Sequence, residues 1–249
     1  MHNAALEALC IDAQYVARDV PPAELAAALA GLRTSNAWGA NLSIPHKEAV
    51  IPLLDSLSPE AKAIGAVNTI VAKNGWLTGY NTDALGFMRS LEQADLHVRG
   101  TDVVVLGAGG AARAVAYGLR QAGAKVAIWN RNPDRAYALA EELGLEAFLS
   151  DTLLPNAVRS ASGLVNTTSV GLEQPDLSPI DDDLLPINWV CDIVYRPLET
   201  RLLRVARQAG IVTVDGLGML VHQGALAFEA WTGQPPDTKL MRAAALEQL

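Results

Sequence analysis

A glycine-rich segment, Gly107–Ala112, has the residue types and spacing that bind a dinucleotide. It follows the apolar run Val103–Leu106 and precedes a stretch of helical composition, so the pattern is G-x-G-x-x-A between a strand and a helix. Gly107 permits the tight turn, and Gly109 lets the backbone approach a pyrophosphate. The N–H groups at the helix start then stabilise the phosphate charge. A glycine turn without a ligand is the alternative, but the order strand, loop, helix and next strand favours a binding site.

The residues after the next expected strand, Lys125–Trp129, bear on the choice of cofactor. An NAD enzyme commonly places Asp or Glu there to accept a hydrogen bond from the ribose 2′-hydroxyl. This chain has Asn130 and Arg131 instead, followed shortly by Arg135. Two guanidinium groups can bind a 2′-phosphate through charge-assisted hydrogen bonds, so we favour NADP. The alternative is that both arginines belong to a solvated helix start.

Two short polar segments, Gly39–Lys47 and Gly79–Asp83, supply candidates for proton transfer. Both lie at expected strand or loop ends, where α/β proteins collect ligand-binding groups. Lys47 can polarise a carbonyl group and protonate its oxygen as hydride arrives, with Asp83 orienting both. Each residue also has an ordinary interpretation, Lys47 as a surface lysine and Asp83 as the N-cap of the following helix. His46 is expected to be exposed.

Other common chemistries are not indicated. The chain has no Tyr-x-x-x-Lys and no Gly-x-Ser-x-Gly, and its histidines and cysteines lack metal-ligand spacing, so no metal site is expected. The formal net charge is −8 with no Lys/Arg block, which disfavours nucleic-acid and anionic-membrane partners. The longest apolar stretch has ten residues, too few to cross a bilayer. With two cysteines (Cys10 and Cys191) and no recognisable targeting segment, we expect a cytoplasmic protein.

Short β-rich runs alternate with Ala/Leu-rich stretches of helical period, which predicts the α/β class with parallel sheets covered by helices. Helices are expected over Glu24–Leu32, Ala84–Leu96, Ala111–Ala122, Asp134–Leu143 and Gly218–Trp231. Strands are expected over Ala13–Ala17, Asn68–Ala72, Val103–Leu106, Val126–Trp129, Gly163–Asn166 and Trp189–Ile193. The change from helix to apolar strand near residue 100 divides the chain into residues 1–99, a dinucleotide-binding part at 100–215, and closing helices at 216–249.

Several segments, in order along the chain, resemble the shikimate dehydrogenase family. They are Asn41–Lys47, Ile64–Thr69, Gly79–Phe87, the glycine loop, Asn130–Arg131 with Arg135, Asn166–Gly171, Asp192–Pro197 and Asp215–Ala225. The likeness runs from residue 1 to about residue 233. It implies NADP-dependent, reversible reduction of 3-dehydroshikimate to shikimate, in the synthesis of chorismate and the aromatic amino acids. It also implies a small-molecule substrate as partner and a monomer or homodimer.

The resemblance assigns roles residue by residue. The family's acid–base pair falls on Lys47 and Asp83. Its substrate-hydroxyl contacts fall on Asn68 and Gln223, and on Ser43, where the family usually has threonine. Its NADP site falls on Gly107, Gly109, Gly110, Ala111, Asn130, Arg131, Arg135, Tyr195, Gly216 and Met219. The implied architecture is an N-terminal α/β substrate-binding domain and a Rossmann-type NADP-binding domain that moves against it over a cleft. The C-terminal helices are expected to return to the substrate-binding domain.

One departure from the family concerns the N-terminus. In the family, the residues that match Met1–Leu6 follow a strand and a Ser-x-Ser-Pro turn, whose hydroxyl groups hold the substrate carboxylate. A misassigned start codon, a shortened version of the chain and a natural variant are the three explanations. Two other functions also stay open: a broader quinate/shikimate dehydrogenase, and a non-catalytic NADP-binding module of the same fold.

Overall fold

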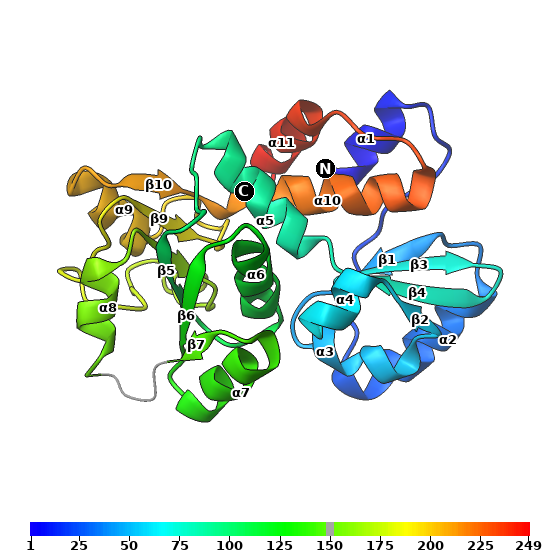
Figure 1. Cartoon of the computed structure of the whole chain (residues 1–249). Coiled ribbons are helices and arrows are strands. Elements are labelled where there is room, and N and C mark those ends of the chain that lie inside the picture. Colours follow the sequence, from blue (N-terminus) through cyan, green and yellow to red (C-terminus); the bar gives the residue numbers. More distant parts are fainter. Residues whose placement is uncertain (148–151) are drawn as a thin grey trace. The chain divides into compact units, whose positions relative to one another are not determined.

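The computed structural model describes residues 1–147 and 152–249. These residues form two compact units (Figure 1). The first unit consists of Met1–Asp83 and Val221–Gln248, and the second of Ala84–Leu220. The first unit is therefore built from both ends of the chain, and the second from its middle.

Two helices contain the points at which the chain passes from one unit to the other. They are α5 (Asp83–Gln93) and α10 (Gly216–Thr232). Sequence analysis placed the divisions at residues 99 and 215, at changes in composition. A boundary inside a continuous helix produces no such change. The compact units are divided after residues 83 and 220, whereas the predicted divisions fall after residues 99 and 215.

The first unit contains a sheet with the strand order β1-β3-β4-β2. Its strands are β1 (Gly39–Asn41), β2 (Ser56–Leu57), β3 (Thr69–Lys73) and β4 (Trp76–Tyr80). β3 pairs antiparallel with both β1 and β4, and β2 pairs parallel with β4. Asn74 and Gly75 join β3 to β4 with positive φ at both positions, as a two-residue hairpin turn with the strands' right-handed twist requires. This sheet is mainly antiparallel, which corrects the expectation of parallel sheets for this part of the chain.

Short helices accompany this sheet. They are α1 (His2–Ala8), α2 (Leu25–Thr34), α3 (His46–Ala49), α4 (Pro59–Ile64), the part of α10 from Val221 and α11 (Thr238–Leu246), with 3-10 turns at Pro22–Glu24 and Ile51–Leu53. Ser58 caps α4 by accepting a hydrogen bond from the N–H of Ala61, and Pro59 occupies the first helical position. One apolar cluster joins helices to the sheet: Leu25, Leu29, Val50, Ala61, Val67, Ile70 and Leu77.

The expected strand at Ala13–Ala17 is wrong: residues 11–20 form neither strand nor helix. A side-chain amide, not a neighbouring strand, binds this backbone. The N–H of Tyr15 donates to Oδ1 of Asn3 at 2.7 Å, and Nδ2 of Asn3 donates to the carbonyl of Tyr15 at 3.0 Å. A side chain satisfies both backbone groups of Tyr15 as a strand partner would, so the apolar residues of this segment do not require a sheet.

Burial of His2 predicts a pH dependence of stability. Its ring stacks on Tyr15 with centroids 4.3 Å apart and lies near Phe228 and Trp231. Burial, aided by the N-terminal ammonium, lowers the pKa of His2 to about 4. The unfolded chain therefore binds more protons than the folded chain between pH 4 and 6.5, and stability falls as pH falls through this window. Through His2, the wild type is expected to lose about 2 kcal/mol of unfolding free energy between pH 7 and pH 5. The His2→Phe variant should not show this loss.

The measurement is urea unfolding of wild type and His2→Phe at both pH values. The difference between the two proteins isolates His2 from other titrating groups. A variant that loses as much stability as the wild type on going to pH 5 would contradict the assignment.

The second unit contains a parallel sheet with the strand order β10-β9-β8-β5-β6-β7. Its strands are β5 (Asp102–Leu106), β6 (Lys125–Trp129), β7 (Glu146–Ala147), β8 (Gly163–Asn166), β9 (Trp189–Asp192) and β10 (Val212–Val214). In register, Leu106 is the partner of both Trp129 and Asn166, and Asn166 is the partner of Asp192. The carboxyl ends of four strands therefore meet at one edge, where ligands bind in sheets of this class.

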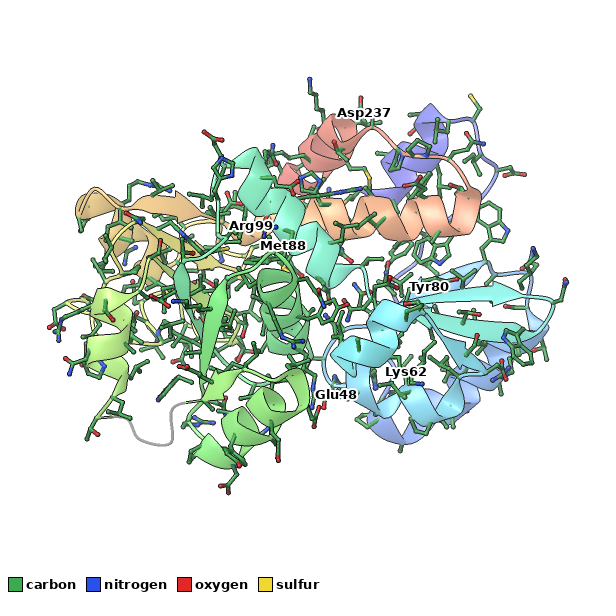
Figure 2. The ribbon with its side chains drawn as sticks, viewed as in Figure 1. Glu48, Lys62, Tyr80, Met88, Arg99 and Asp237 are labelled. Carbon is green, nitrogen blue, oxygen red and sulfur yellow. The ribbon has the colours of Figure 1, made fainter. Side chains whose placement is uncertain are left out.

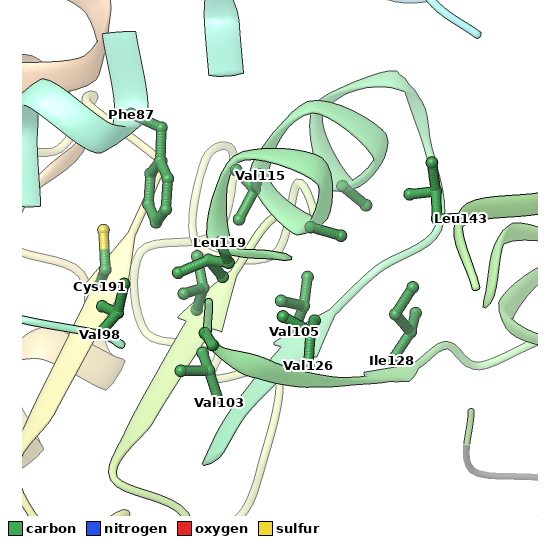
Figure 3. Close-up of a cluster of buried hydrophobic side chains, with 14 of the residues drawn as sticks. Phe87, Val98, Val103, Val105, Val115, Leu119, Val126, Ile128, Leu143 and Cys191 are labelled. Carbon is green, nitrogen blue, oxygen red and sulfur yellow. The ribbon is translucent and has the colours of Figure 1, made fainter. Parts of the chain in front are cut away.

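Successive residues of β5 pack alternately into two apolar clusters, one on each face of this sheet. Val103 and Val105 belong to one apolar cluster with Val115 and Leu119 of α6, part of which Figure 3 shows. Val104 and Leu106 belong to a second cluster. The helices of this unit besides α5 and the start of α10 are α6 (Gly110–Gln121), α7 (Pro133–Leu143), α8 (Leu154–Ser160) and α9 (Arg201–Gln208). Burial on both faces explains why β5 is continuously apolar.

These elements confirm the α/β class and, to within a few residues, all of the predicted helices. They also confirm the predicted strands other than Ala13–Ala17. In the described part of the chain, no helix combines the length and apolar character needed to span a membrane.

Candidate active site

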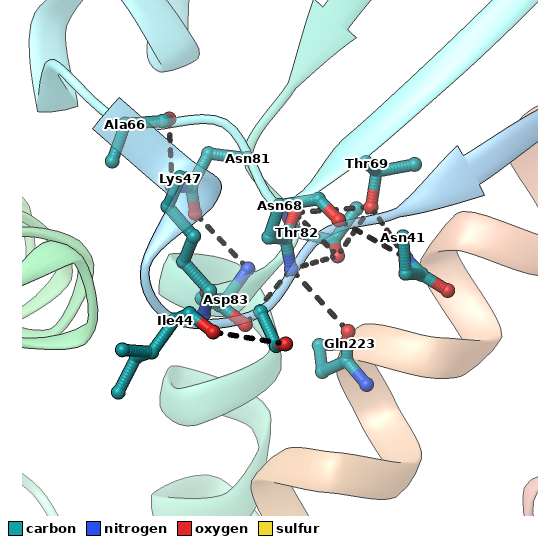
Figure 4. A network of polar contacts seen from close by, with 11 residues as sticks. Asn41, Ile44, Lys47, Ala66, Asn68, Thr69, Asn81, Thr82, Asp83 and Gln223 are labelled. Atoms are coloured by element: carbon teal, nitrogen blue, oxygen red, sulfur yellow. Dashed lines mark hydrogen bonds and ion pairs between the residues drawn. The ribbon is translucent and has the colours of Figure 1, made fainter. Parts of the chain in front are cut away.

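Lys47 and Asp83 form an ion pair in the first unit. Lys47 lies on the short helix α3, and Asp83 is the first residue of α5. Nζ of Lys47 lies 2.7 Å from Oδ2 of Asp83 (Figure 4). The two side chains are only 16% and 6% exposed, so the pair is far less hydrated than a surface salt bridge. The structure thus brings together two residues that lie 36 positions apart in the sequence.

Asn68 connects this pair to its surroundings. Its Nδ2 donates to Oδ1 of Asp83 at 2.8 Å and to Oγ1 of Thr82 at 2.9 Å, and lies 3.3 Å from Oε1 of Gln223. Its Oδ1 accepts from the N–H of Thr82 at 2.8 Å and from Oγ1 of Thr69 at 3.0 Å. Both carboxylate oxygens of Asp83 therefore have donors, one from Lys47 and one from Asn68. Asp83 is held in a single orientation.

The backbone around the pair is fixed by further hydrogen bonds. Oδ1 of Asn81 accepts from the N–H of Asp83 at 3.0 Å, and Nδ2 of Asn81 donates to the carbonyl of Ala66 at 2.9 Å. The carbonyl of Lys47 accepts from the N–H of Val67 at 2.8 Å. These bonds join the segment before α5 to the loop before β3, and that loop to α3. These hydrogen bonds hold three chain segments together next to the contact between Lys47 and Asp83.

The predicted substrate residues differ in how closely they join this network. Asn68 and Gln223 belong to it, the latter from the part of α10 in the first unit. Ser43 is exposed, and its Oγ lies 3.4 Å from the carbonyl of the adjacent Ile44. The expectation for His46 is wrong: its ring is buried, and Nε2 lies 2.7 Å from the carbonyl of Val20. This backbone partner satisfies one of the two ring nitrogens of His46.

Sequence analysis missed the residues that support the pair, namely Asn41, Thr69, Asn81 and Thr82. Nδ2 of Asn41 donates to Oγ1 of Thr69 at 3.0 Å, which extends the network to β1. The available signal was the position of Asn68-Thr69 and Asn81-Thr82 beside Asp83 in polar segments at strand ends. Short polar side chains at such ends are candidates for positioning a site, but their partners cannot be read from spacing.

The glycine loop of the second unit has the shape that a pyrophosphate requires. Gly107 has φ of +113°, and a Cβ atom there would lie 2.5 Å from Oγ1 of Thr167. Gly109 immediately precedes α6, and a Cβ atom there would meet nothing within 4 Å. No side chain caps α6, so the N–H groups of its first turn, including those of Gly110 and Ala111, have no capping side chain as partner. The residues present therefore fit the diphosphate of a dinucleotide.

The residues after β6 fit an additional phosphate. Oδ1 of Asn132 accepts from the N–H of Asp134 and caps α7, while Nδ2 of Asn130 donates to the carbonyl of Asn132 at 2.9 Å. Arg131 and Arg135 are exposed at this helix start, and neither forms an ion pair within residues 1–147 and 152–249. Two guanidinium groups are thus available for an anion.

The other predicted cofactor residues lie at the carboxyl edge of the sheet or directly after it. Tyr195 is 39% exposed in the loop after β9. Gly216 begins α10, and a Cβ atom there would lie 2.2 Å from the carbonyl oxygen of Ile193. Met219 is buried in the core of the second unit. Across the described residues, no three His, Cys, Asp or Glu side chains are grouped so that they could hold a metal ion.

This chain combines a Rossmann-type unit, which carries a glycine loop, with a partly buried Lys–Asp pair. These features are typical of dinucleotide-dependent α/β oxidoreductases. Three family models match the sequence: the shikimate dehydrogenase substrate binding domain at residues 1–70, shikimate/quinate 5-dehydrogenase at 90–169, and the shikimate 5′-dehydrogenase C-terminal domain at 216–246. The chain belongs to the shikimate dehydrogenase family.

Individual relatives agree over nearly their full length. A shikimate dehydrogenase (NADP(+)) of Symbiobacterium thermophilum is 50% identical, with 100% of this chain and 89% of the relative covered. One of Thermus thermophilus is 48% identical, with 100% and 92% covered. A crystal structure of shikimate 5-dehydrogenase from Thermus thermophilus, in complex with NADP(H) and shikimate, matches with a TM-score of 0.93. It is 47% identical, and 100% of this chain and 93% of that chain are covered.

Proposed function

We propose that this chain is an NADP-dependent shikimate dehydrogenase, which interconverts 3-dehydroshikimate and shikimate. The observation that carries the proposal is the contact between Lys47 and Asp83, held by Asn68 beside Gln223, in a chain of this family. Relatives at about half identity bear the name shikimate dehydrogenase (NADP(+)). Charged groups placed this way suit proton transfer to a ketone oxygen.

The residues of the first unit perform the proton chemistry. When bound, NADPH supplies a hydride to the ketone carbon. Lys47 donates a proton from its ammonium group to the ketone oxygen and stabilises the negative charge that develops there. Asp83 holds the ammonium group in place through its 2.7 Å contact. In the reverse direction, neutral Lys47 accepts the proton of the substrate hydroxyl group.

Three polar residues bind the substrate hydroxyl groups in this proposal. Asn68 and Gln223 offer amide groups in direct contact with each other, and Ser43 offers an exposed hydroxyl group. An amide both donates and accepts hydrogen bonds, which suits an alcohol. The low exposure of Lys47 strengthens the attraction between its ammonium group and the reacting oxygen.

The second unit binds NADP(H). The backbone of Gly107, Gly109, Gly110 and Ala111 binds the diphosphate, the side chains of Asn130, Arg131 and Arg135 bind the 2′-phosphate, and Tyr195, Gly216 and Met219 border the nicotinamide. The lack of a side-chain cap on α6 and the exposure of both arginines support this assignment.

The test follows NADPH oxidation with 3-dehydroshikimate, and compares NADH as cofactor and 3-dehydroquinate as substrate. We expect turnover with NADPH and 3-dehydroshikimate, and a lower kcat/KM for each alternative. A second candidate is a broader quinate/shikimate dehydrogenase, because one matching family model spans both activities. Comparable kcat/KM for the two ketones would favour it. NADP binding without turnover of either ketone would show a non-catalytic module instead.

A further inference from the structure

Asp192, which the mechanism above does not use, is a buried carboxylate at the carboxyl end of β9. Its Oδ1 accepts from the N–H of Val194 and from Nδ2 of Asn166, both at 3.0 Å. Its Oδ2 accepts from Oγ1 of Thr200 at 2.8 Å. No Lys, Arg or His of the described residues forms an ion pair with it. Three neutral donors from three chain segments therefore surround one buried charge.

A buried charge without a counterion is costly, so its contacts are expected to matter for more than stability. Burial raises the pKa of Asp192 to about 6 although its three hydrogen bonds oppose the shift. At the neutral pH of an assay the group is therefore mainly ionised and accepts all three bonds.

One of these bonds leads to the glycine loop. Oδ1 of Asn166, the residue that donates to Asp192, accepts from the N–H of Thr168 at 3.0 Å and from its Oγ1 at 2.7 Å. Between them, Thr167 donates from Oγ1 to the carbonyl of Leu106 at 2.6 Å. The same Oγ1 atom fills the space where a Cβ atom of Gly107 would lie. The orientation of Asn166 thus determines where the loop after β8 meets the predicted diphosphate site.

A second bond leads to the predicted nicotinamide site. Val194, whose N–H binds Asp192, directly precedes Tyr195. The carbonyl oxygens of Ile193 and Val194 lie so close to Gly216 that a Cβ atom there would approach them to 2.2 and 2.7 Å. The turn that Asp192 holds therefore sets both the start of α10 and the direction of the loop that carries Tyr195.

We propose that Asp192 is a positioning residue for NADP(H): its carboxylate fixes the loops after β8 and β9 against the glycine loop and the start of α10. This inference rests on the proposed cofactor site. Asp192 itself does not touch the cofactor. It acts through Asn166 and Val194, both bound to its Oδ1 atom, whereas Thr200 is bound to Oδ2 and belongs to the start of α9.

The different roles of the two oxygens provide a matched set of variants. Asp192→Asn keeps the shape but replaces one acceptor by a donor and removes the charge. Asn166→Ala breaks the link to the glycine loop from the other side. Thr200→Val removes only the bond to Oδ2 and the side-chain cap of α9, which lowers stability but leaves both bonds to Oδ1 intact.

The experiment measures NADP⁺ binding by isothermal titration calorimetry at pH 7.5, together with KM for NADP⁺ and for shikimate. We expect Kd and KM for NADP⁺ to rise about tenfold in Asp192→Asn and Asn166→Ala. Loss of a hydrogen-bond partner that orients a metal-binding residue has an effect of about this size. KM for shikimate stays unchanged in both. Thr200→Val binds NADP⁺ like the wild type despite a lower melting temperature.

Equal NADP⁺ affinity in Asp192→Asn and wild type would overturn the inference. So would equal losses of affinity in Asp192→Asn and Thr200→Val, because these would reflect general destabilisation. These two outcomes concern the inference alone, because the wild type still binds NADP⁺ in both. If the wild type itself does not bind NADP⁺, the proposed function fails as well.

Discussion

A Lys47→Met variant is expected to lose about 10³-fold in kcat. General acid–base catalysis by a positioned side chain contributes about 10²–10⁴-fold, and Lys47 also supplies the charge that stabilises the developing alkoxide. Methionine matches the length of the lysine stem and removes only the ammonium group. We expect KM for NADPH to change little, because the residues assigned to the cofactor belong to the second unit. Steady-state kinetics with 3-dehydroshikimate and NADPH measure both quantities.

Lys62 provides the matched control for this variant. It is an exposed lysine on α4 of the same unit, and it is labelled in Figure 2. Lys62→Met is expected to keep the wild-type kcat. If Lys47→Met also keeps kcat within a few-fold of the wild type, Lys47 is not the proton donor.

Replacing Arg131 and Arg135 together by alanine is expected to lower kcat/KM for NADPH by about 10²-fold or more. A charge-assisted hydrogen bond contributes about 1.5–3 kcal/mol, which is about 10- to 100-fold for each arginine. NADH has no 2′-phosphate, so its kcat/KM stays near the wild-type value and the preference for NADPH falls by the same factor. The measurement is kcat/KM for both cofactors at saturating 3-dehydroshikimate.

Arg159→Ala serves as the control, because Arg159 is an exposed arginine of the second unit that pairs with Asp183. It should leave the ratio between the cofactors unchanged. Equal losses with NADPH and NADH in the double variant would mean that the two arginines support the fold of this region and do not recognise the 2′-phosphate.

The parts of the fold that were predictable from sequence have strong local signals. β5 is apolar on both faces because both are buried, and Gly107–Ala112 follows it directly. β4 was missed because Gly79 interrupts it, and the need for a glycine there is set by tertiary contacts: a Cβ atom would lie within 3 Å of Leu54 and Val67. Such contacts have no counterpart in local composition.

The site was only partly predictable for the same reason. Lys47 and Asp83 each had an ordinary interpretation in the sequence, and only the fold makes them neighbours. Gln223 lies 155 positions from Asn68, so no spacing rule connects the two. Without the family resemblance, the sequence patterns indicate the dinucleotide loop and the candidates Lys47 and Asp83, but not Asn68 or Gln223.

The most direct test of the account is a double-mutant cycle on kcat with Lys47→Met, Asp83→Asn and the double variant. If the two residues act as one acid–base unit, each single variant already removes most of what the pair contributes. The double variant should then be no more than a few-fold slower than Lys47→Met alone. A double variant whose loss equals the product of the two single losses would mean that Lys47 and Asp83 act independently, and would contradict the mechanism.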